Sequence, residues 1–466
     1  MVTASPIPPS DLIARLHAIV PGRLLTEGAA LEATRTDRSG WWSAAAPLAL
    51  VEAESAEEVQ AVMRLASETG TPVVPRGAGT GLAGGATSTP GCIVLSVLRM
   101  NRILEISLDD ELAVVEPGVI NQHLSDALAP HGYVFSPDPA SKAISTVGGN
   151  IATNAGGLMC AKYGVTREAV LGLSVVLADG ELLTTGRRTV KGVTGYDVTA
   201  LMTGSEGTLG VIVGATVRIR PIPAGAVWTV GAFFDDVTAA AAACASVTAA
   251  SIRPAVMELM DAAACAAVSL YLGREPIAPG AAFVLVQADG AGAAEEARAV
   301  EGVLRSSGGH RVMVSDDEVT GEELLAFRRS FGHALDAQGE VLVEDVCVPR
   351  TQLAAMFAEI ERIGAAYGLE IPTVAHAGDG NLHPNFVIPR DRTEPGEFVP
   401  DFVWQAADEL FTACVRLGGT LTGEHGVGLL KKRWLAGELG ERGLDIQRQI
   451  KQVFDPAGIL NPGKVY

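Results

Sequence analysis

The sequence predicts an α+β fold made of two dissimilar regions. In the first region, apolar residues 46–51, a helical spacing over 56–68 and apolar residues 71–74 read as strand, helix and strand. Such a βαβ unit requires a crossover connection within one sheet. Further along, strand and helix patterns alternate over 227–234, 237–250, 283–287 and 293–306. This second region reads as helices on one face of an antiparallel sheet.

Other elements follow from local patterns. Apolar residues at helical spacing predict helices over 11–20, 321–337, 350–367 and 401–416, and an apolar run predicts a strand over 341–348. Strand-like residues 171–178 and 181–185 flank Asp179-Gly180. Because this dipeptide suits a tight turn, the pair is expected to form a hairpin.

Composition and charge restrict the function before any motif is considered. Of the 466 residues, 48% are hydrophobic and 19% are charged, which predicts a folded protein with a large core. The formal net charge is −19, and the one tight basic run is Lys431-Lys432-Arg433. Nucleic-acid binders depend on clustered basic residues, so this charge excludes them and disfavours a purely electrostatic membrane attachment.

Targeting and cysteine patterns point to the cytoplasm. The N-terminal residues have no basic n-region and no apolar h-region, and the most apolar stretches, 169–178 and 238–250, are too short to span a bilayer. The six cysteines are scattered without a C-x-x-C pair. We expect reduced thiols, no integral membrane segment and no iron–sulfur cluster.

Three segments of the chain are dense in glycine: 75–86, 136–164 and 204–212. The first has five glycines in twelve residues, directly after a predicted strand. Residues without side chains allow the backbone to approach a ligand closely. Three such segments predict one extended ligand lying along a sheet edge.

The first glycine segment also matches a dinucleotide fingerprint, Gly79-x-Gly81-x-x-Gly84, with Glu105 at the expected distance. A Rossmann fingerprint opens a long helix after the first strand of its fold. Here residues 87–91 and a strand at 92–96 follow instead, and the preceding strand is not the first. A nicotinamide-linked Rossmann dehydrogenase is therefore disfavoured.

Two histidines flank another turn, in the segment His376-Ala377-Gly378-Asp379-Gly380-Asn381-Leu382-His383. A two-residue turn centred on Asp379-Gly380 pairs His376 with His383 on one face, with Cβ atoms roughly 5 Å apart. The two imidazoles then share a metal ion or belong to a structural loop of hydrogen-bonded histidines.

A carboxylate and a third imidazole, Glu424 and His425, stand side by side between Gly423 and Gly428. Two histidines and one carboxylate suit a divalent metal with open positions. Adjacent strand residues face opposite ways, so joint use of Glu424 as ligand and His425 as base requires an irregular backbone. A loop ion pair is the alternative.

Six motifs in order resemble the FAD-linked 2-hydroxy-acid dehydrogenases, a family that includes the FAD-linked subunit of glycolate oxidase, D-lactate dehydrogenase and D-2-hydroxyglutarate dehydrogenase. The motifs are 75–82, 145–157, 204–212, 376–383, 423–428 and 454–464. The resemblance implies a two-lobed FAD-binding domain of the vanillyl-alcohol-oxidase (PCMH) type and an α+β cap with an antiparallel sheet. It divides the chain into an N-terminal helical lead, the FAD domain, the cap and a C-terminal segment that returns to the FAD domain, over 1–45, 46–225, 226–417 and 418–466.

The resemblance also implies which residues contact FAD. The pyrophosphate loop comprises Pro75, Arg76, Gly77, Ala78, Gly79, Thr80, Gly81 and Leu82. The segment along the pyrophosphate and isoalloxazine contributes Pro137, Asp138, Ser141, Thr146, Gly148, Gly149, Asn150, Thr153, Gly156 and Gly157. Glu206, Gly207 and Ile212 match the adenine and ribose end, and Asn461 matches a contact near the flavin. The first loop has no histidine, so non-covalent FAD is expected.

The family's metal ligands match His376, His383 and Glu424, which implies a divalent ion, zinc first, with manganese or iron as alternatives. His425 matches the base and Asn385 a substrate contact. Arg328 matches the arginine that holds the substrate carboxylate. An ordinary helix-surface arginine is the alternative, because Arg329 is adjacent.

The implied reaction oxidises a D-2-hydroxy acid to its 2-keto acid. The metal lowers the pKa of the substrate hydroxyl, His425 takes the proton and hydride passes to flavin N5, although abstraction of the C2 proton is equally compatible. Gly332 and Val343 stand where the 2-hydroxyglutarate enzymes carry threonine and lysine. This favours D-lactate, glycolate or a larger apolar monocarboxylic acid.

Other functions remain open at the level of sequence. A metal-dependent hydrolase would use only the histidine and glutamate cluster, and an FAD-binding accessory subunit of a larger oxidase would have no turnover of its own. The expected electron acceptor is a quinone, an electron-transfer flavoprotein, a partner subunit or oxygen. A homodimer and a peripheral association with the inner membrane are both compatible with the sequence.

Overall fold

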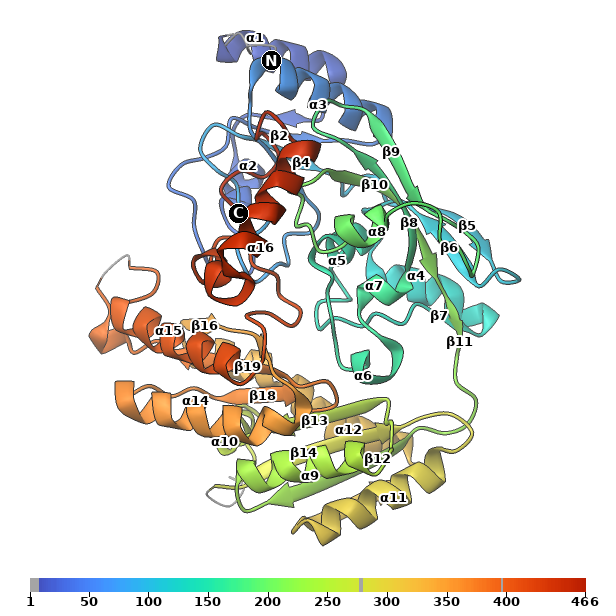
Figure 1. Cartoon of the computed structure of the whole chain (residues 1–466), viewed down its shortest axis with the longest axis vertical. Helices are drawn as coiled ribbons and strands as arrows, with labels where there is room; N and C mark the ends of the chain where they lie inside the picture. Colours follow the sequence, from blue (N-terminus) through green and yellow to red (C-terminus); the bar gives the residue numbers. More distant parts are fainter. Residues whose placement is uncertain (1–7, 276–279, 395–396) are drawn as a thin grey trace. The chain divides into compact units, whose positions relative to one another are not determined.

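The computed structural model describes residues 8–275, 280–394 and 397–466. The chain forms two compact units, drawn in Figure 1. The first contains residues up to Gly156, together with Gly164–Ile222 and Glu424–Tyr466. The second contains Gly157–Tyr163 and Pro223–Gly423.

The first sheet of the first unit contains the predicted βαβ unit. Its strand order is β1-β2-β4-β3, formed by Leu24–Leu25, Ala49–Glu52, Ile93–Ser96 and Val73–Arg76. Helix α3 (Ala56–Thr69) makes the crossover, and β2 and β3 both run parallel to β4. Ser55 caps α3 by accepting a hydrogen bond from the Glu58 amide at 3.3 Å.

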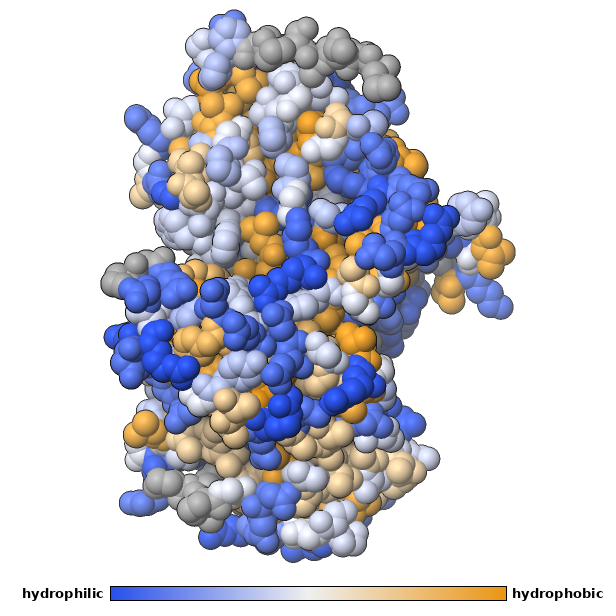
Figure 2. All heavy atoms as spheres, turned by 60° about the vertical axis from the view of Figure 1, so that its left-hand side comes forward, coloured by the Kyte–Doolittle hydropathy of each residue, from blue (hydrophilic) through white to orange (hydrophobic). Residues whose placement is uncertain are grey.

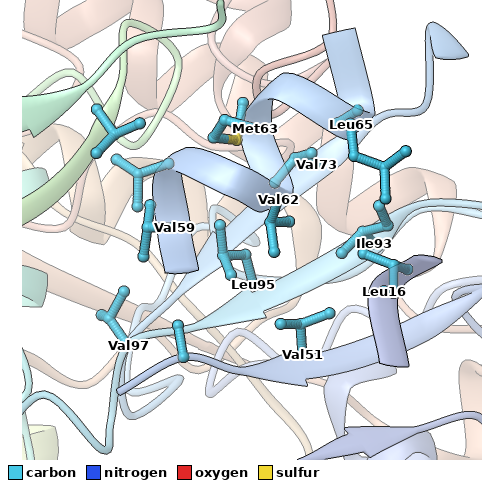
Figure 3. Close-up of a cluster of buried hydrophobic side chains, with 14 of the residues drawn as sticks. Leu16, Val51, Val59, Val62, Met63, Leu65, Val73, Ile93, Leu95 and Val97 are labelled. Carbon is cyan, nitrogen blue, oxygen red and sulfur yellow. The ribbon is translucent and has the colours of Figure 1, made fainter. Parts of the chain in front are cut away.

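The apolar face of α3 forms the core over this sheet. Figure 3 shows Val59 and Val62 directed from the helix toward the strands that carry Val51 and Leu95, and Met63 belongs to the same core. All five side chains are fully buried. The predicted helical spacing is therefore the packing surface of the helix.

The second sheet of the first unit is antiparallel, with the order β5-β6-β10-β8-β9. Its strands are Ile103–Ser107, Leu112–Val115, Val211–Arg218, Val170–Val176 and Leu182–Gly186. The predicted hairpin is confirmed, because Val176 pairs with Leu182 across β8 and β9. The remaining elements are α1 (Pro9–Ile19), α2 (Ala29–Glu32), α4 (Asn121–Leu128), β7 (Tyr133–Val134), α5 (Val147–Thr153), α7 (Thr166–Ala169), α8 (Val198–Met202), β11 (Arg220–Pro221) and α16 (Leu435–Phe454).

An antiparallel sheet of eight strands forms the centre of the second unit, in the order β15-β12-β14-β13-β18-β19-β16, with β17 paired to β19. The strands are β12 (Trp228–Phe234), β13 (Val256–Met260), β14 (Ala282–Ala288), β15 (His310–Ser315), β16 (Val341–Val343), β17 (Val346–Cys347), β18 (Thr373–His376) and β19 (Asn381–Val387). This arrangement agrees with the predicted α+β class.

Helices cover this sheet more completely than expected. They are α6 (Cys160–Tyr163), α9 (Val237–Ala249), α10 (Ala262–Tyr271), α11 (Ala293–Ser306), α12 (Glu318–Arg329), α13 (Phe331–Asp336), α14 (Leu353–Tyr367) and α15 (Asp401–Arg416). All five residues of β13 are buried, although successive residues face opposite sides of a sheet. The centre of the sheet is therefore covered on both faces, and the expectation of a single helical layer is wrong.

Two predicted elements of this unit are interrupted. The helix expected over 321–337 breaks at Ser330, whose ψ of −10° departs from the α-helical value, and forms α12 and α13. The strand expected over 341–348 breaks between β16 and β17 at Glu344, opposite Pro384. Proline has no N–H to donate to a ladder, which explains the interruption.

The exposed surface is of mixed polarity, as the composition predicts. Figure 2 shows hydrophilic side chains mixed with small apolar patches on the face that it presents. None of the six cysteines, all of which are among the described residues, forms a disulfide. In the described part of the chain, none of the helices combines the length and the apolar character that crossing a bilayer requires.

Candidate active site

The first glycine segment leaves its backbone amides available. Among the described residues, no amide from Gly77 to Gly85 donates a hydrogen bond, although these residues are partly or fully buried. Gly79 has a φ of +71°, which disfavours a residue with a Cβ. The Arg76 guanidinium folds back and donates to the Ala86 carbonyl at 2.6 Å, and its burial lowers its pKa. The segment is thus a loop of main-chain donors.

The second glycine segment packs directly against this loop. A Cβ added to Gly77 would lie 2.6 Å from the Thr146 Oγ1. Thr146 is the N-cap of α5 and accepts a hydrogen bond from the Gly149 amide at 3.1 Å. Behind it, the Asn121 Nδ2 donates to the Asn150 Oδ1 and the Pro137 carbonyl, both at 3.1 Å. Two predicted ligand segments therefore meet within one unit.

Asn461 ties the third glycine segment and the C-terminal residues to the same place. Its Nδ2 donates to the Gly85 carbonyl at 3.0 Å and to the Glu206 carbonyl at 2.7 Å. Its Oδ1 is buried and has no partner among the described residues. The residues predicted from three distant segments and the C-terminal motif are thus brought together.

Glu206 connects this region to the loop that carries His425. Its carboxylate accepts hydrogen bonds from the amides of Val427 and Gly428 at 2.7 and 2.9 Å. Burial raises the pKa of this carboxyl to about 7, although both amides and the charge of Lys431 act in the opposite direction. The Glu206 side chain therefore anchors the backbone two residues after His425.

Glu424 and His425 lie in the first unit, beside the second glycine segment. A Cβ added to Gly156 would lie 2.3 Å from the Glu424 Oε2, so any larger residue there would displace the Glu424 carboxylate. The His425 Nε2 is 3.9 Å from the Glu424 Oε1, within ion-pair range but too long for a hydrogen bond. Both side chains are mostly buried.

In the second unit, the histidine hairpin differs from its predicted register. His376 pairs with Asn381, and His383 pairs with Val374. The amides of Asp379 and Gly380 both donate to the His376 carbonyl, at 3.2 and 3.0 Å, and close a four-residue loop instead of the expected two-residue turn. A shift of two residues keeps both side chains on one face. The imidazole centroids are 5.0 Å apart with an interplanar angle of 81°.

Each histidine lies next to a buried carboxylate that the sequence analysis did not single out. The His376 Nδ1 is 2.7 Å from the Glu258 Oε1, and the His383 Nδ1 is 3.7 Å from the Asp345 Oδ1. Thr422 donates to the other oxygen of Asp345 at 2.6 Å. One sequence signal was present for Glu258, because it is the one charged residue in the apolar strand β13.

The predicted substrate residues occupy the same sheet and its adjoining helix. The Arg328 Nε donates to the Glu258 Oε2 at 2.8 Å, and the side chain is mostly buried, which rules out a solvated helix-surface arginine. Asn385 on β19 donates through Nδ2 to the His383 carbonyl at 2.6 Å and to the Pro372 carbonyl at 3.1 Å. Its Oδ1 is the end available to a ligand.

Comparison with known proteins identifies the family. A model for the C-terminal domain of FAD linked oxidases matches residues 225–465, and a model for an FAD binding domain matches residues 47–186. The chain is 38% identical to the glycolate oxidase subunit GlcD of Bacillus subtilis (strain 168), over 90% of this chain and 89% of that protein. It is 33% identical to the D-lactate dehydrogenase of Anaerostipes hadrus, over 98% and 97%.

The chain belongs to the FAD-linked oxidases. It is an FAD-dependent oxidoreductase of the glycolate oxidase and D-lactate dehydrogenase type. Its structure superimposes on p-cresol methylhydroxylase with substrate bound, with a TM-score of 0.79 and 18% identity over 98% of this chain and 96% of that one. This likeness shows the fold, and it confirms the predicted PCMH-type architecture.

The residues of the first unit fit the FAD that this family binds. A run of unused amides suits a diphosphate, since main-chain N–H groups bind anions without cationic side chains. Gly77 and Gly156 let their backbone lie close to the side chains of Thr146 and Glu424, so the glycine segments pack tightly together. Beyond the loop, the buried hydroxyls of Thr87, Ser88 and Thr89 have no partner in the described part of the chain, so polar groups remain for a ligand.

Three residues predicted to contact FAD are not placed with the other predicted cofactor residues in the way that the prediction implies. Ile212 lies on β10 and packs against the second core of the first unit, while Gly157 belongs to the second unit. The Glu206 carboxylate is engaged by the loop at Val427 rather than facing open space. Sequence spacing does not reveal these differences, because it does not show which way a side chain points.

Proposed function

We propose that this FAD-linked oxidase converts a D-2-hydroxy acid into the corresponding 2-keto acid. The observation that carries the proposal is the position of two consecutive residues. Gly423 lies against the Asn381 side chain, where an added Cβ would be 2.3 Å from its Oδ1, and Asn381 pairs with His376. The next residue, Glu424, lies against Gly156 of the second glycine segment. Because Gly423 and Glu424 are consecutive residues, the chain passes directly from the residues beside the histidine pair to the residue beside the second glycine segment.

We propose that His376, His383 and Glu424 hold a divalent metal, with zinc first and manganese or iron as alternatives. Two imidazoles and a carboxylate suit all three ions and leave positions open for a hydroxy acid. The contact between the His376 Nδ1 and Glu258 supports the assignment, because metal-bound histidines commonly donate their second N–H to a carboxylate. The alternative is that no metal binds and that the two histidines serve only the packing of the hairpin, since their rings are arranged edge to face.

The remaining roles belong to the chain's own side chains. In the proposal, His425 accepts the proton of the substrate hydroxyl, Arg328 binds the substrate carboxylate and Asn385 accepts a hydrogen bond from the substrate through its Oδ1. Bound FAD supplies a two-electron acceptor at N5. The arrangement serves removal of the C2 hydrogen as hydride or as a proton equally well.

The substrate is proposed to be a monocarboxylic acid such as D-lactate, glycolate or a larger apolar 2-hydroxy acid. Gly332 contributes no side chain, and no atom lies within 4 Å of the position that its Cβ would occupy. Val343 on β16 is apolar. Neither residue offers a donor to a second carboxylate. The names of the relatives, glycolate oxidase subunit and D-lactate dehydrogenase, support the same class.

Electrons are proposed to leave the flavin for a quinone, an electron-transfer flavoprotein, a partner subunit or oxygen. The six cysteines are scattered along the sequence, without the closely spaced cysteines that iron–sulfur motifs contain. A cytoplasmic or peripheral membrane location suits all four acceptors.

Anaerobic bleaching of the flavin tests this function. The purified holoprotein is mixed with D- and L-lactate, glycolate and longer 2-hydroxy acids, before and after treatment with a chelator. We expect one D-acid to bleach the visible absorption, loss of bleaching after chelation and recovery with Zn²⁺. A flavin that no hydroxy acid reduces would overturn the substrate class and favour an accessory subunit. Bleaching that survives complete metal removal would overturn the metal proposal alone.

A further inference from the structure

A single carboxylate lies inside the central sheet of the second unit. Glu258 is on β13, is 1% exposed and pairs across the strands with His376. Alternation along the strand puts it on the same face as Met260, which packs against the core that includes Phe327 of α12. A buried carboxylate is costly unless its charge and its lone pairs are satisfied.

Both oxygens of this carboxylate are satisfied by residues with proposed roles in the reaction. Oε1 is 2.7 Å from the His376 Nδ1, and Oε2 accepts from the Arg328 Nε at 2.8 Å. A histidine nitrogen facing a carboxylate oxygen at this distance carries the proton. The His376 Nε2 is then left with its lone pair. Among the described residues, Glu258 is the one hydrogen-bond acceptor of Arg328, so both terminal Nη groups remain available.

We infer that Glu258 is a positioning residue that orients the metal ligand His376 and the substrate arginine Arg328 at the same time. The inference rests on the proposed function and extends it. One oxygen fixes the tautomer and the ring of His376, so that Nε2 points to the metal. The other oxygen accepts from the Arg328 Nε. The two Nη groups of the guanidinium can then donate to the substrate carboxylate.

The two histidines differ in this respect. His383 has Asp345 at 3.7 Å, beyond hydrogen-bond distance, and that carboxylate accepts from Thr422. Glu258 contacts its histidine at hydrogen-bond distance and also contacts the arginine. A change at Glu258 is therefore expected to alter metal binding and substrate binding together, whereas the two properties would respond separately to changes in His376 or Arg328.

Glutamine at position 258 isolates this effect. It keeps the shape of the side chain but has a single acceptor oxygen, so it satisfies either the His376 N–H or the Arg328 N–H and turns its own amide toward the other. We expect E258Q to bind Zn²⁺ about 10- to 100-fold more weakly than the wild type. The KM for the reducing hydroxy acid is expected to rise as well.

The matched control is E116Q. Glu116 is also a buried carboxylate that accepts from an arginine, Arg102, at 2.7 and 3.1 Å, but it belongs to the first unit. Zn²⁺ affinity of the metal-free holoproteins, with FAD bound, is measured by competition with a chromophoric chelator. The wild type and E116Q are expected to agree, and H376A is expected to lose this binding.

The outcomes separate the inference from the proposed function. Weaker Zn²⁺ binding in E258Q with an unchanged flavin content supports the role of Glu258. Equal Zn²⁺ affinity and equal KM in E258Q and the wild type overturn it, while the metal site stands. A wild type that binds no Zn²⁺ overturns both. If E258Q does not fold, E258D decides: it keeps both acceptors but is one methylene shorter, and at least a threefold loss of affinity supports the inference while unchanged affinity overturns it.

Discussion

The predicted ligand-binding groups of the two units differ in kind: main-chain amides in the first unit and side chains in the second. In the first unit the predicted ligand surface is main chain: a loop of unused amides from Gly77 to Gly85, set against the helix cap at Thr146. In the second unit it is side chain: two imidazoles, each beside a buried carboxylate. A backbone site fails when a Cβ is added, whereas a side-chain site fails when a supporting partner is removed.

This contrast implies that flavin binding and metal binding respond independently to mutation. The amide loop needs no charged side chain to bind its ligand, and the histidine hairpin has glycine only in its turn. A substitution in the amide loop should therefore remove the flavin and spare the metal, and a substitution of His376 or His383 should do the reverse. Glu424 lies in the first unit and stands outside this contrast. A single variant that loses both ligands would break the distinction.

The largest effect is expected from His425, which neither kind of site needs for binding. His425→Ala should slow anaerobic reduction of the flavin by the active hydroxy acid about 10²- to 10⁴-fold, because a general base is lost. Flavin and metal contents should stay at wild-type levels. His123→Ala, an exposed histidine on α4, is the control. A wild-type reduction rate in His425→Ala would remove His425 from the mechanism.

A smaller but more selective effect is expected from His383→Ala. Removal of a ligand should weaken Zn²⁺ binding by at least the 10- to 100-fold that loss of a supporting partner costs. Flavin content, read from the visible spectrum, should be unchanged, since His383 lies in the second unit. Metal content is measured on the same samples by elemental analysis. Loss of flavin together with metal would contradict the independence of the two parts.

Much of the fold was predictable because its elements are locally determined. Helices α11 and α15 begin and end at the residues that their apolar spacing predicts, Ala293–Ser306 and Asp401–Arg416. The hairpin of β8 and β9 follows from Asp179-Gly180. The interruption opposite Pro384 depends on a partner strand that is distant in the sequence, so a local pattern missed it.

The site residues could be predicted where their residue types alone mark them. They could not be predicted where the orientation of a side chain or its partner in the folded chain decides its role. Glycine density marked the amide loop, and the histidine spacing marked the hairpin. The hairpin register was wrong because the turn closes on the His376 carbonyl through the amides of Asp379 and Gly380, and the spacing of the two histidines does not show this. Glu258 was missed because its partners, His376 and Arg328, come from β18 and α12.

Gly77→Ala tests whether the main-chain amides of the first unit bind FAD. The added methyl would lie 2.6 Å from the Thr146 Oγ1, so the loop or the helix cap must move. Overpacking of this kind costs about 1–3 kcal/mol, which corresponds to roughly a 5- to 150-fold weaker Kd for FAD. Gly302→Ala, in a position with no atom within 4 Å, is the control. FAD affinity is measured by titration of the deflavinated protein, and unchanged affinity would show that the loop adapts.

The smallest effect concerns Glu206, the side chain that anchors the main chain after His425. Because burial raises its pKa to about 7, the folded protein binds this proton more tightly than the unfolded chain does. Its contribution to stability is fully present below the unfolded value and is lost as the pH rises through the folded one. Between about pH 5.5 and 7.5, the free energy of unfolding should fall by about 2 kcal/mol on this account.

Glu206→Gln removes that titration while it preserves the shape of the protonated side chain. Thermal melts with excess FAD should show the wild type losing roughly 2–4 °C relative to the variant over this pH interval. Glu105→Gln is the control, because Glu105 is exposed and Arg188 lowers its pKa, so its titration ends below the interval. Parallel pH profiles for the wild type and Glu206→Gln would mean that the Glu206 carboxyl is ionised throughout. The two amides of Val427 and Gly428 would then outweigh burial, and this part of the first unit would depend on a charged side chain in the way the second unit does.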